Sequence, residues 1–194
     1  MLDKIKDLYK ESIQSQISAS SLLTGQIVQG VETMVGCLLQ NKKIIVCGHG
    51  RAYANAQILV ANLLNRYELA RPSFPAILLN VDSAVGAAII ADNGHNDLYQ
   101  RQFDAVAQEG DLLIVFSPSD NEEAILNVIH SALNKELKII ALTGANHDHI
   151  KGILTENDLE IAVPATKESR ILEQHLFIIN SFCELIDYTL FSHS

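Results

Sequence analysis

The sequence has only three cysteines and few basic residues, and each scarcity excludes a class of protein. Cys37, Cys47 and Cys183 lie far apart with no Cys-x-x-Cys pair, so neither a disulfide framework nor a zinc knuckle is indicated. We expect three small buried apolar side chains in a reducing compartment. Because 14 Lys and Arg stand against 23 Asp and Glu, the net charge is -9. With no basic stripe to offset that charge, direct nucleic-acid binding is not expected.

Long hydrophobic runs are also missing. The longest, Leu176 to Cys183, is interrupted by Asn180 and Ser181 and is too short to span a bilayer. Charged residues between Asp3 and Glu11 break up the first apolar positions, which leaves none of the continuous stretch that a signal peptide requires. We therefore expect a cytoplasmic protein with no membrane contact. The length of 194 residues predicts one α/β domain with a full hydrophobic core.

What the sequence does contain is a regular alternation of short apolar runs and amphipathic segments. Runs rich in Ile, Leu and Val predict strands at Lys43–Cys47, Ala76–Leu79, Leu112–Phe116, Lys138–Thr143 and Leu159–Val163. Runs that are apolar on both faces are typical of a parallel sheet covered on both sides. Crossover helices are predicted between them, at Tyr53–Tyr67, Asp97–Ala107, Asn121–Asn134 and His147–Leu154. The pattern predicts an α/β fold, a three-layer, doubly wound parallel sheet.

Helical patterns also flank the strands. Apolar residues at spacings of three and four over Leu2–Ile17 predict an amphipathic helix, and a break near Thr24 and Gly25 separates it from a second helix through Ile27–Leu39. The last predicted helix, Glu168–Leu190, is apolar around most of its circumference. One sheet face cannot cover all of that surface, and a second copy of the chain is the simplest cover. We therefore predict a homo-oligomer.

Polar turns follow two of the predicted strands. Ligands of open parallel sheets bind beyond the carboxyl ends of the strands. Gly48-His49-Gly50-Arg51 can bring backbone amides close to an anion at the start of the next helix. In the second turn, Ser117 to Glu122, hydroxyls and amides can hold a phosphate, but Asp120 with Glu123 equally forms a capping box that any helix uses. His147 and His149, near Asp148, suit solvated polar positions as well as a surface metal cluster.

Longer strings of residues carry a family resemblance. Cys47, Asn55-Ala56-Gln57, Arg66-Tyr67, Arg71-Pro72 and Pro75-Ala76-Ile77 resemble the sugar isomerase (SIS) family of the phosphoheptose isomerases, and resemble its DiaA branch, the DnaA initiator-associating proteins, more closely still. The likeness continues through Ala141 to Gly144, Arg170-Ile171 and Asp187 to Phe191, and so covers essentially the whole chain. It implies a single SIS domain over residues 1–194, with an N-terminal helical segment (1–33) and a core (34–194), and a homotetramer built as a dimer of dimers.

The resemblance also implies where isomerase chemistry would lie. Those isomerases bind a metal through a His and a Glu four residues apart on the helix after the first turn, and a Gln and a His on the last helix; the same positions supply the acid and base. By alignment this chain has Ile58, Asn62, Leu172 and Asn180 there. Aliphatic side chains donate no lone pair, and Asn does not titrate near neutral pH. We expect no metal, no cofactor and no catalysis by the family mechanism.

Phosphate binding is weakened as well. The family has a Ser at the position of Ala52, and its second loop lacks the equivalents of Pro118, Asp120 and Glu122, which remove a donor and add negative charge. The residues that could still form a sugar-phosphate site are Arg51, Asn55, Ser117, Ser119 and Asn121.

The end of the chain matches a feature of the DiaA proteins. They use a Leu-Phe pair near the C-terminus to contact the N-terminal domain of DnaA, and Leu190-Phe191 matches that pair. The resemblance thus implies a non-enzymatic regulator of chromosomal replication initiation, which binds DnaA as a homo-oligomer and promotes its assembly at the origin. The alternative is a phosphoheptose isomerase or a sugar-phosphate sensor that uses the cleft.

Overall fold

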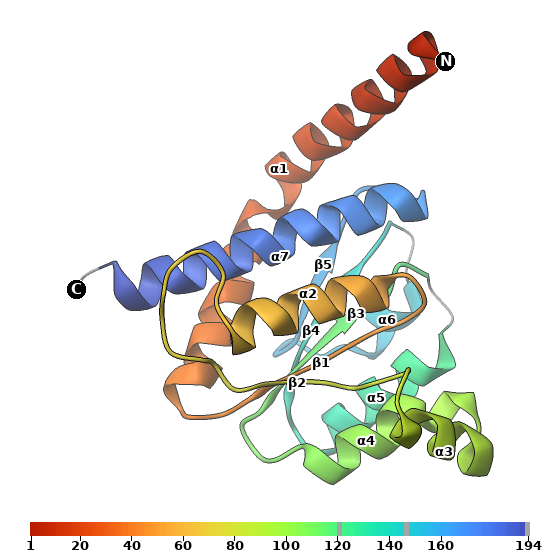
Figure 1. Ribbon diagram of the computed structural model, residues 1–194, viewed down its shortest axis with the longest axis vertical. Helices are drawn as coiled ribbons and strands as arrows, with labels where there is room; N and C mark the ends of the chain where they lie inside the picture. Colours follow the sequence, from red (N-terminus) through yellow and green to blue (C-terminus); the bar gives the residue numbers. More distant parts are fainter. Residues whose placement is uncertain (120–121, 146–147, 193–194) are drawn as a thin grey trace.

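A computed structural model describes residues 1–119, 122–145 and 148–192 of the chain, and it contains a five-stranded parallel sheet (Figure 1). The strands are β1 (Ile44–Gly48), β2 (Ala76–Leu78), β3 (Leu112–Phe116), β4 (Lys138–Thr143) and β5 (Leu159–Ala162), in the order β2-β1-β3-β4-β5. The predicted doubly wound sheet is confirmed, and every strand boundary lies within one residue of the prediction. The strand β2 is added on one side of β1, whereas β3, β4 and β5 are added on the other side, so the direction of strand addition changes between β1 and β3.

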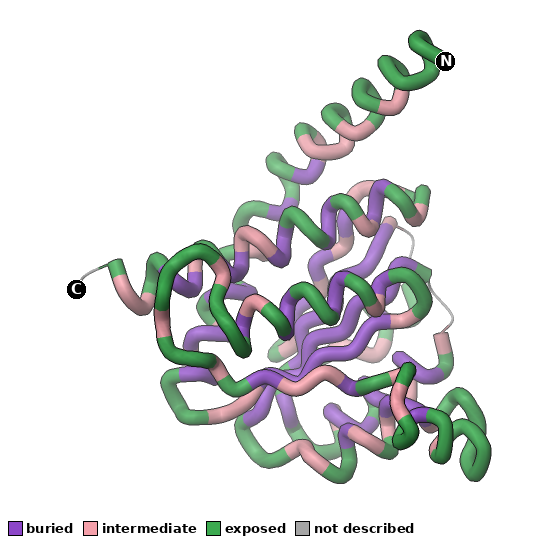
Figure 2. Tube along the Cα trace, in the orientation of Figure 1, coloured by how far each residue is buried: buried purple, intermediate pink, exposed green. Residues whose placement is uncertain are grey.

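Helices cover both faces of the sheet. One face packs against α1 (Leu2–Leu39), α2 (Ala52–Leu64) and α7 (Glu168–Phe191), and the other against α4 (Leu98–Val106), α5 (Glu123–Asn134) and α6 (Asp148–Ile153). Alternate residues of one strand enter the two cores: Ile44 and Val46 belong to the first, Ile45 and Cys47 to the second. The strands lie between these helical layers (Figure 2), which explains why β1 and β3 are buried along their whole length.

The N-terminal region differs from the prediction. The expected break near Thr24 and Gly25 is wrong, because α1 is one continuous helix of 38 residues. The Thr24 hydroxyl donates to the Ser20 carbonyl 2.6 Å away, so its hydrogen bond is made within the helix, and a Cβ at Gly25 would meet only open space. The second half of α1 packs on the sheet, whereas its first half extends beyond the body of the molecule (Figure 1).

Two further helical segments were not predicted: α3 (Ala84–Asn93) and the short 3-10 helix η1 (His95–Asp97). Ser83 caps α3, since its side chain accepts a hydrogen bond from the Gly86 amide. Within the described residues, α1 is the one helix long and apolar enough to cross a membrane by length and composition. Core helices of soluble proteins pass the same test, so this property does not indicate a membrane span.

Candidate functional site

The two polar turns meet at the carboxyl ends of β1 and β3, as predicted. Gly48 and Phe116 are partners in the parallel register, and the His49 amide donates to the Phe116 carbonyl at 3.1 Å. Glycine is required twice in the first turn: a Cβ at Gly48 would lie 2.7 Å from the Ala52 carbonyl oxygen, and Gly50 has a φ of +55°. The turn is thereby narrow enough for α2 to begin directly behind it.

Glu122 joins these two turns. Its Oε2 lies 2.9 Å from Nε2 of His49, and its Oε1 accepts a hydrogen bond of 3.0 Å from the Ser119 hydroxyl. The buried Ser117 hydroxyl donates to the Ser119 carbonyl at 2.7 Å. The structure therefore brings Ser117 and Ser119 together as predicted, but with their hydroxyls directed to protein acceptors. A carboxylate bridges the turns in the region where the family resemblance places a phosphate.

Arg51 and Asn55 connect α2 to α7. The Arg51 guanidinium is ion-paired with Glu168 at the start of α7, and its side chain is 77% exposed. Asn55 is buried, and its Nδ2 donates to the Leu172 carbonyl at 3.1 Å. Both donors of the predicted cleft thus have partners on the neighbouring helix.

Two predictions for the second turn concern residues at its end. Asn121 lies outside the described residues, as does Asp120. The predicted capping box is wrong, because α5 begins after Glu122, which occupies the N-cap position without a side-chain cap hydrogen bond. The Glu122 carboxylate is directed to His49 and Ser119 instead of the helix amides.

The four positions that the family resemblance assigns to the isomerase metal lie on α2 and α7, which run side by side (Figure 1). Ile58 is 37% exposed, and the Asn62 side chain lies beside the Cys183 thiol of α7. Leu172 and Asn180 complete the set on α7. These side chains carry no carboxylate, imidazole or thiolate, so they do not fit a catalytic metal. Among the described residues no group of three or more His, Cys, Asp and Glu could hold one, and His147 lies outside them.

Two titratable residues in the first half of α7, His175 and Glu173, are engaged in separate contacts. His175 is fully buried, with Nε2 3.1 Å from the Thr143 carbonyl and its ring edge-on to Phe116. Glu173 is turned to the surface, where it pairs with Arg170 and accepts from the Ser12 hydroxyl of α1 at 3.0 Å. The two side chains therefore lie apart, as their spacing predicts.

All three thiols are free and buried, as predicted. Burial raises the pKa of the Cys47 thiol, and raises the pKa of Cys37 and of Cys183 to about 11 each. A raised pKa keeps a thiol protonated at neutral pH, so none of the three is suited to nucleophilic chemistry.

The C-terminal residues singled out by the sequence, Leu190 and Phe191, are half-buried at the end of α7. Leu190 packs against the first core, and the Phe191 ring stacks on Phe74 with centroids 6.2 Å apart. The sequence reasoning did not assign a role to Phe74 or to Arg71, whose side chain is 1% exposed and bonded to Asp187. The sequence signal that could have identified them is the charged residue Arg71 in the family motif that continues to Pro75.

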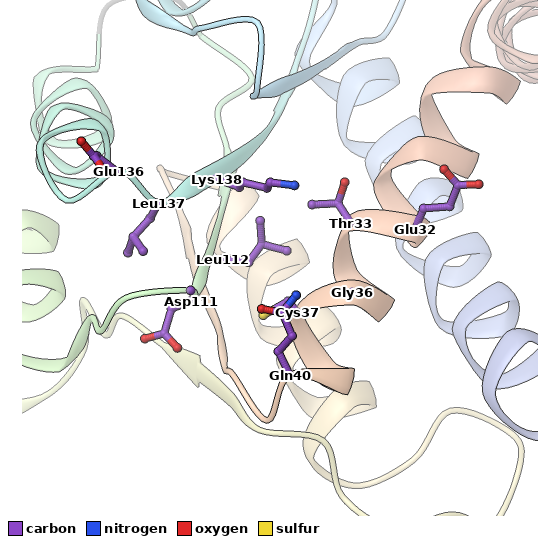
Figure 3. A pocket seen from close by; sticks show the side chains of 11 residues that line it. Glu32, Thr33, Gly36, Cys37, Gln40, Asp111, Leu112, Glu136, Leu137 and Lys138 are labelled. Atoms are coloured by element: carbon purple, nitrogen blue, oxygen red, sulfur yellow. The ribbon is translucent and has the colours of Figure 1, made fainter.

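A pocket of about 230 Å³ lies at the amino ends of the strands, opposite the two polar turns (Figure 3). Its walls come from the second half of α1 and from the segments that enter β3 and β4, including Cys37, Asp111 and Lys138. Asp111 is already occupied, because it pairs with Lys43 and accepts from the backbone amides of Lys43 and Gln108. Since ligands of parallel sheets bind at the carboxyl ends of strands, this pocket at the amino ends is not the candidate site.

Comparisons with known proteins agree with this architecture. The family model for the SIS domain matches residues 8–144. A DnaA initiator-associating protein DiaA of Pectobacterium carotovorum is 42% identical, over 100% of this chain and 98% of its own length. A phosphoheptose isomerase of Colwellia psychrerythraea is 44% identical, over 98% and 97%. The structure of a phosphoheptose isomerase from Francisella tularensis superposes with a TM-score of 0.92 at 35% identity, over 96% of this chain and 97% of that one. The chain belongs to the SIS-domain family, in the phosphoheptose isomerase-like group that includes the DnaA initiator-associating proteins.

Proposed function

We propose that this chain is a non-enzymatic, cytoplasmic regulator of chromosomal replication initiation, which acts as a single SIS domain over residues 1–194. In this proposal a homo-oligomer of the chain binds the N-terminal domain of the initiator DnaA and promotes its assembly at the origin. The full-length likeness to a protein named for association with DnaA supports the role. Sequence similarity alone does not distinguish a regulator from an isomerase, because a relative named phosphoheptose isomerase is equally similar to this chain.

The observation that favours the regulator is the position of Glu122. A sugar phosphate entering between the two turns would have to displace the carboxylate from Ser119 and His49, or bind beside it. Two unit negative charges about 6 Å apart repel by roughly 3 kcal/mol at an effective dielectric near 20. The candidate donors Arg51, Asn55 and Ser117 are each bonded within the protein, so binding would also break existing contacts.

The side chains on α2 and α7 support the absence of catalysis. Isomerisation between an aldose and a ketose requires a group that removes a proton and a group that returns it. Ile58, Asn62, Leu172 and Asn180, at the positions implied by the family resemblance, provide neither, and Glu173 and His175 are held in separate contacts.

Leu190 and Phe191 are the proposed partner-binding residues. They form an apolar surface at the end of α7, next to Phe74. An aliphatic and an aromatic anchor at the centre of a small interface suffice for micromolar binding. The net charge of -9 is compatible with a protein that contacts the initiator and not its DNA.

Self-association multiplies this surface. Large apolar side chains are exposed along the first half of α1 and on the middle of α7: Leu2, Ile5, Tyr9, Ile13, Ile17, Leu176 and Phe177. Apolar side chains in such number need a cover, and we assign it to further copies in a homotetramer, a dimer of dimers. Several copies of the Leu190–Phe191 surface in one particle would then hold several initiator molecules at high effective concentration.

The test is binding of the purified chain to the immobilised N-terminal domain of DnaA from the same organism. We expect saturable binding that the double variant Leu190→Ala, Phe191→Ala loses. The control is Val85→Ala, which trims an exposed apolar residue on the distant helix α3 and should bind like the wild type. Sedimentation velocity on each protein must show an unchanged oligomer. Absence of wild-type binding up to tens of micromolar would refute the proposal.

The second candidate, a phosphoheptose isomerase or a sugar-phosphate sensor, is favoured by the structural likeness to the Francisella enzyme. It predicts that a heptose phosphate raises the melting temperature, and that Arg51→Ala abolishes the shift. Turnover that tracks metal content would identify an enzyme, and a shift without turnover would identify a sensor.

A further inference from the structure

One buried arginine ties the end of α7 to the end of α2. Arg71 lies in the segment between α2 and β2, and its side chain is 1% exposed. Nε donates to Oδ1 of Asp187 at 2.6 Å, and Nη2 and Nη1 donate to the carbonyls of Asn62 and Leu63 at 2.9 and 3.1 Å. Because these carbonyls belong to the last turn of α2, the guanidinium also satisfies acceptors that the helix itself leaves open.

The same guanidinium supports the aromatic pair at the C-terminal surface. Its central carbon lies 3.9 Å from the centroid of the Phe74 ring, in a cation–π contact. Phe74 stacks in turn on Phe191, with an angle of 21° between the ring planes. Asp187 precedes Phe191 by one helical turn, so the contacts form a closed circuit: Arg71 to Phe74, Phe74 to Phe191, and back along α7 to Asp187 and Arg71.

Asp187 depends on this arginine. Its side chain is 8% exposed, and its second oxygen, Oδ2, is buried without a hydrogen bond from any described residue. A buried carboxylate with one satisfied oxygen needs its ion-pair partner in place. The position of Arg71 therefore determines where the last turn of α7 and the rings beside it can lie.

We propose that Phe74 is a third residue of the partner-binding surface formed by Leu190 and Phe191, and that Arg71 is the positioning residue that holds this surface together. This inference rests on the function proposed above. Phe74 and Phe191 are stacked on each other, and both rings and the neighbouring Leu190 side chain are only half-buried, so part of their apolar surface is accessible. Such a surface fits an apolar segment of the partner, with Arg71 beneath it and out of reach of solvent.

Hydrogen exchange tests the positioning role without any partner. In Arg71→Lys, the amides from Tyr188 to Ser192 should exchange about tenfold faster, because Lys cannot hold Asp187 and the α2 carbonyls together. Amides near Ile178, in the middle of α7, should be unaffected. The matched control is Arg66→Lys in the same segment, an exposed arginine with one hydrogen bond to the Glu68 carbonyl. Unchanged exchange at the end of α7 in Arg71→Lys would refute the role.

Binding to the initiator domain tests Phe74. Phe74→Ala should weaken binding about tenfold while the protein stays oligomeric, and Phe74→Leu should lose less, because it keeps an apolar contact without the stacked ring. If Phe191→Ala loses binding and Phe74→Ala does not, Phe74 is not part of the surface, although the proposed function stands. If the wild type does not bind, the proposed function and the assignment of Phe74 both fail, and the exchange rates still decide the role of Arg71.

Discussion

Replacing Arg71 by methionine should be among the most destabilising single substitutions in this chain. The change removes the partner of a buried carboxylate, and breaking a buried ion pair in this way typically costs about 3–5 kcal/mol. The lost cation–π contact with Phe74 adds about 0.5–2 kcal/mol. Methionine restores part of the packing, so we expect a loss of about 4 kcal/mol in the free energy of unfolding. Domains of this size have about 5–15 kcal/mol in all.

A double-mutant cycle separates the charge from the packing. In the variant Arg71→Met, Asp187→Leu both charges are gone, and the loss should shrink to about 1–2 kcal/mol, since no unpaired carboxylate stays buried. Urea unfolding followed by circular dichroism measures each variant, at one protomer concentration because self-association contributes to stability. Arg66→Met, an exposed arginine, should change stability by no more than about 0.5 kcal/mol. The reasoning is refuted if Arg71→Met loses less than about 1 kcal/mol, or if adding Asp187→Leu makes it worse.

Three further predictions concern other parts of the molecule. Glu122→Gln removes the negative charge between the two turns, so it should raise the affinity for inorganic phosphate, measured by calorimetry, by up to about a hundredfold. The control Glu123→Gln, at an exposed neighbouring residue, should leave that affinity unchanged. Equal phosphate affinities of Glu122→Gln and the wild type would contradict the assigned role of Glu122. Lys167 and Arg170 lower the pKa of Glu11, so its contribution to holding α1 on α7 is present above its ordinary value of 4.5 and is lost as the pH falls through the lowered value. After correction for the intrinsic pH dependence of exchange, the amides at the start of α1 should lose protection over that acid range in the wild type and less in Glu11→Gln; identical protection profiles would exclude the contact. The buried thiols should react with a disulfide reagent at pH 8 at least about a hundredfold more slowly than in the unfolded chain, and fast labelling of the native protein would show that the cores open.

The fold could be predicted from the sequence because its signals are local. The central strands β1 and β3 are runs that are apolar on both faces, and this pattern requires a sheet covered by helices on both sides. The two errors in the helices have different origins. Gly25 interrupts the apolar pattern of α1, but an exposed glycine costs a helix only about 1 kcal/mol, and packing of the following turns on the sheet outweighs that cost. The helix α3 is apolar nearly throughout and shows no helical period, so no pattern marked it.

The candidate site could be predicted only in part. Parallel topology alone places the turns after β1 and β3 at one edge, which brings Ser117 and Ser119 to the predicted region. Their hydrogen bonds depend on side-chain directions in three dimensions: Glu122 reaches across to His49, and Arg51 extends to Glu168, 117 residues away in sequence.

The sequence by itself determined the strands, the edge at which the two polar turns meet, and the residue types at the positions that the family resemblance assigns to the isomerase metal, because these depend on residue identity and near-neighbour pattern. Ile58 has no metal-binding atom in any fold. Only the tertiary structure decided which polar groups are satisfied, and by what. It placed a carboxylate between the two polar turns. It also brought Phe191 into contact with Phe74, which in turn contacts Arg71, and both of these residues lie more than 100 residues earlier in the sequence. Whether a charge or a ring is available to a ligand depends on such long-range contacts, and no local pattern encodes them.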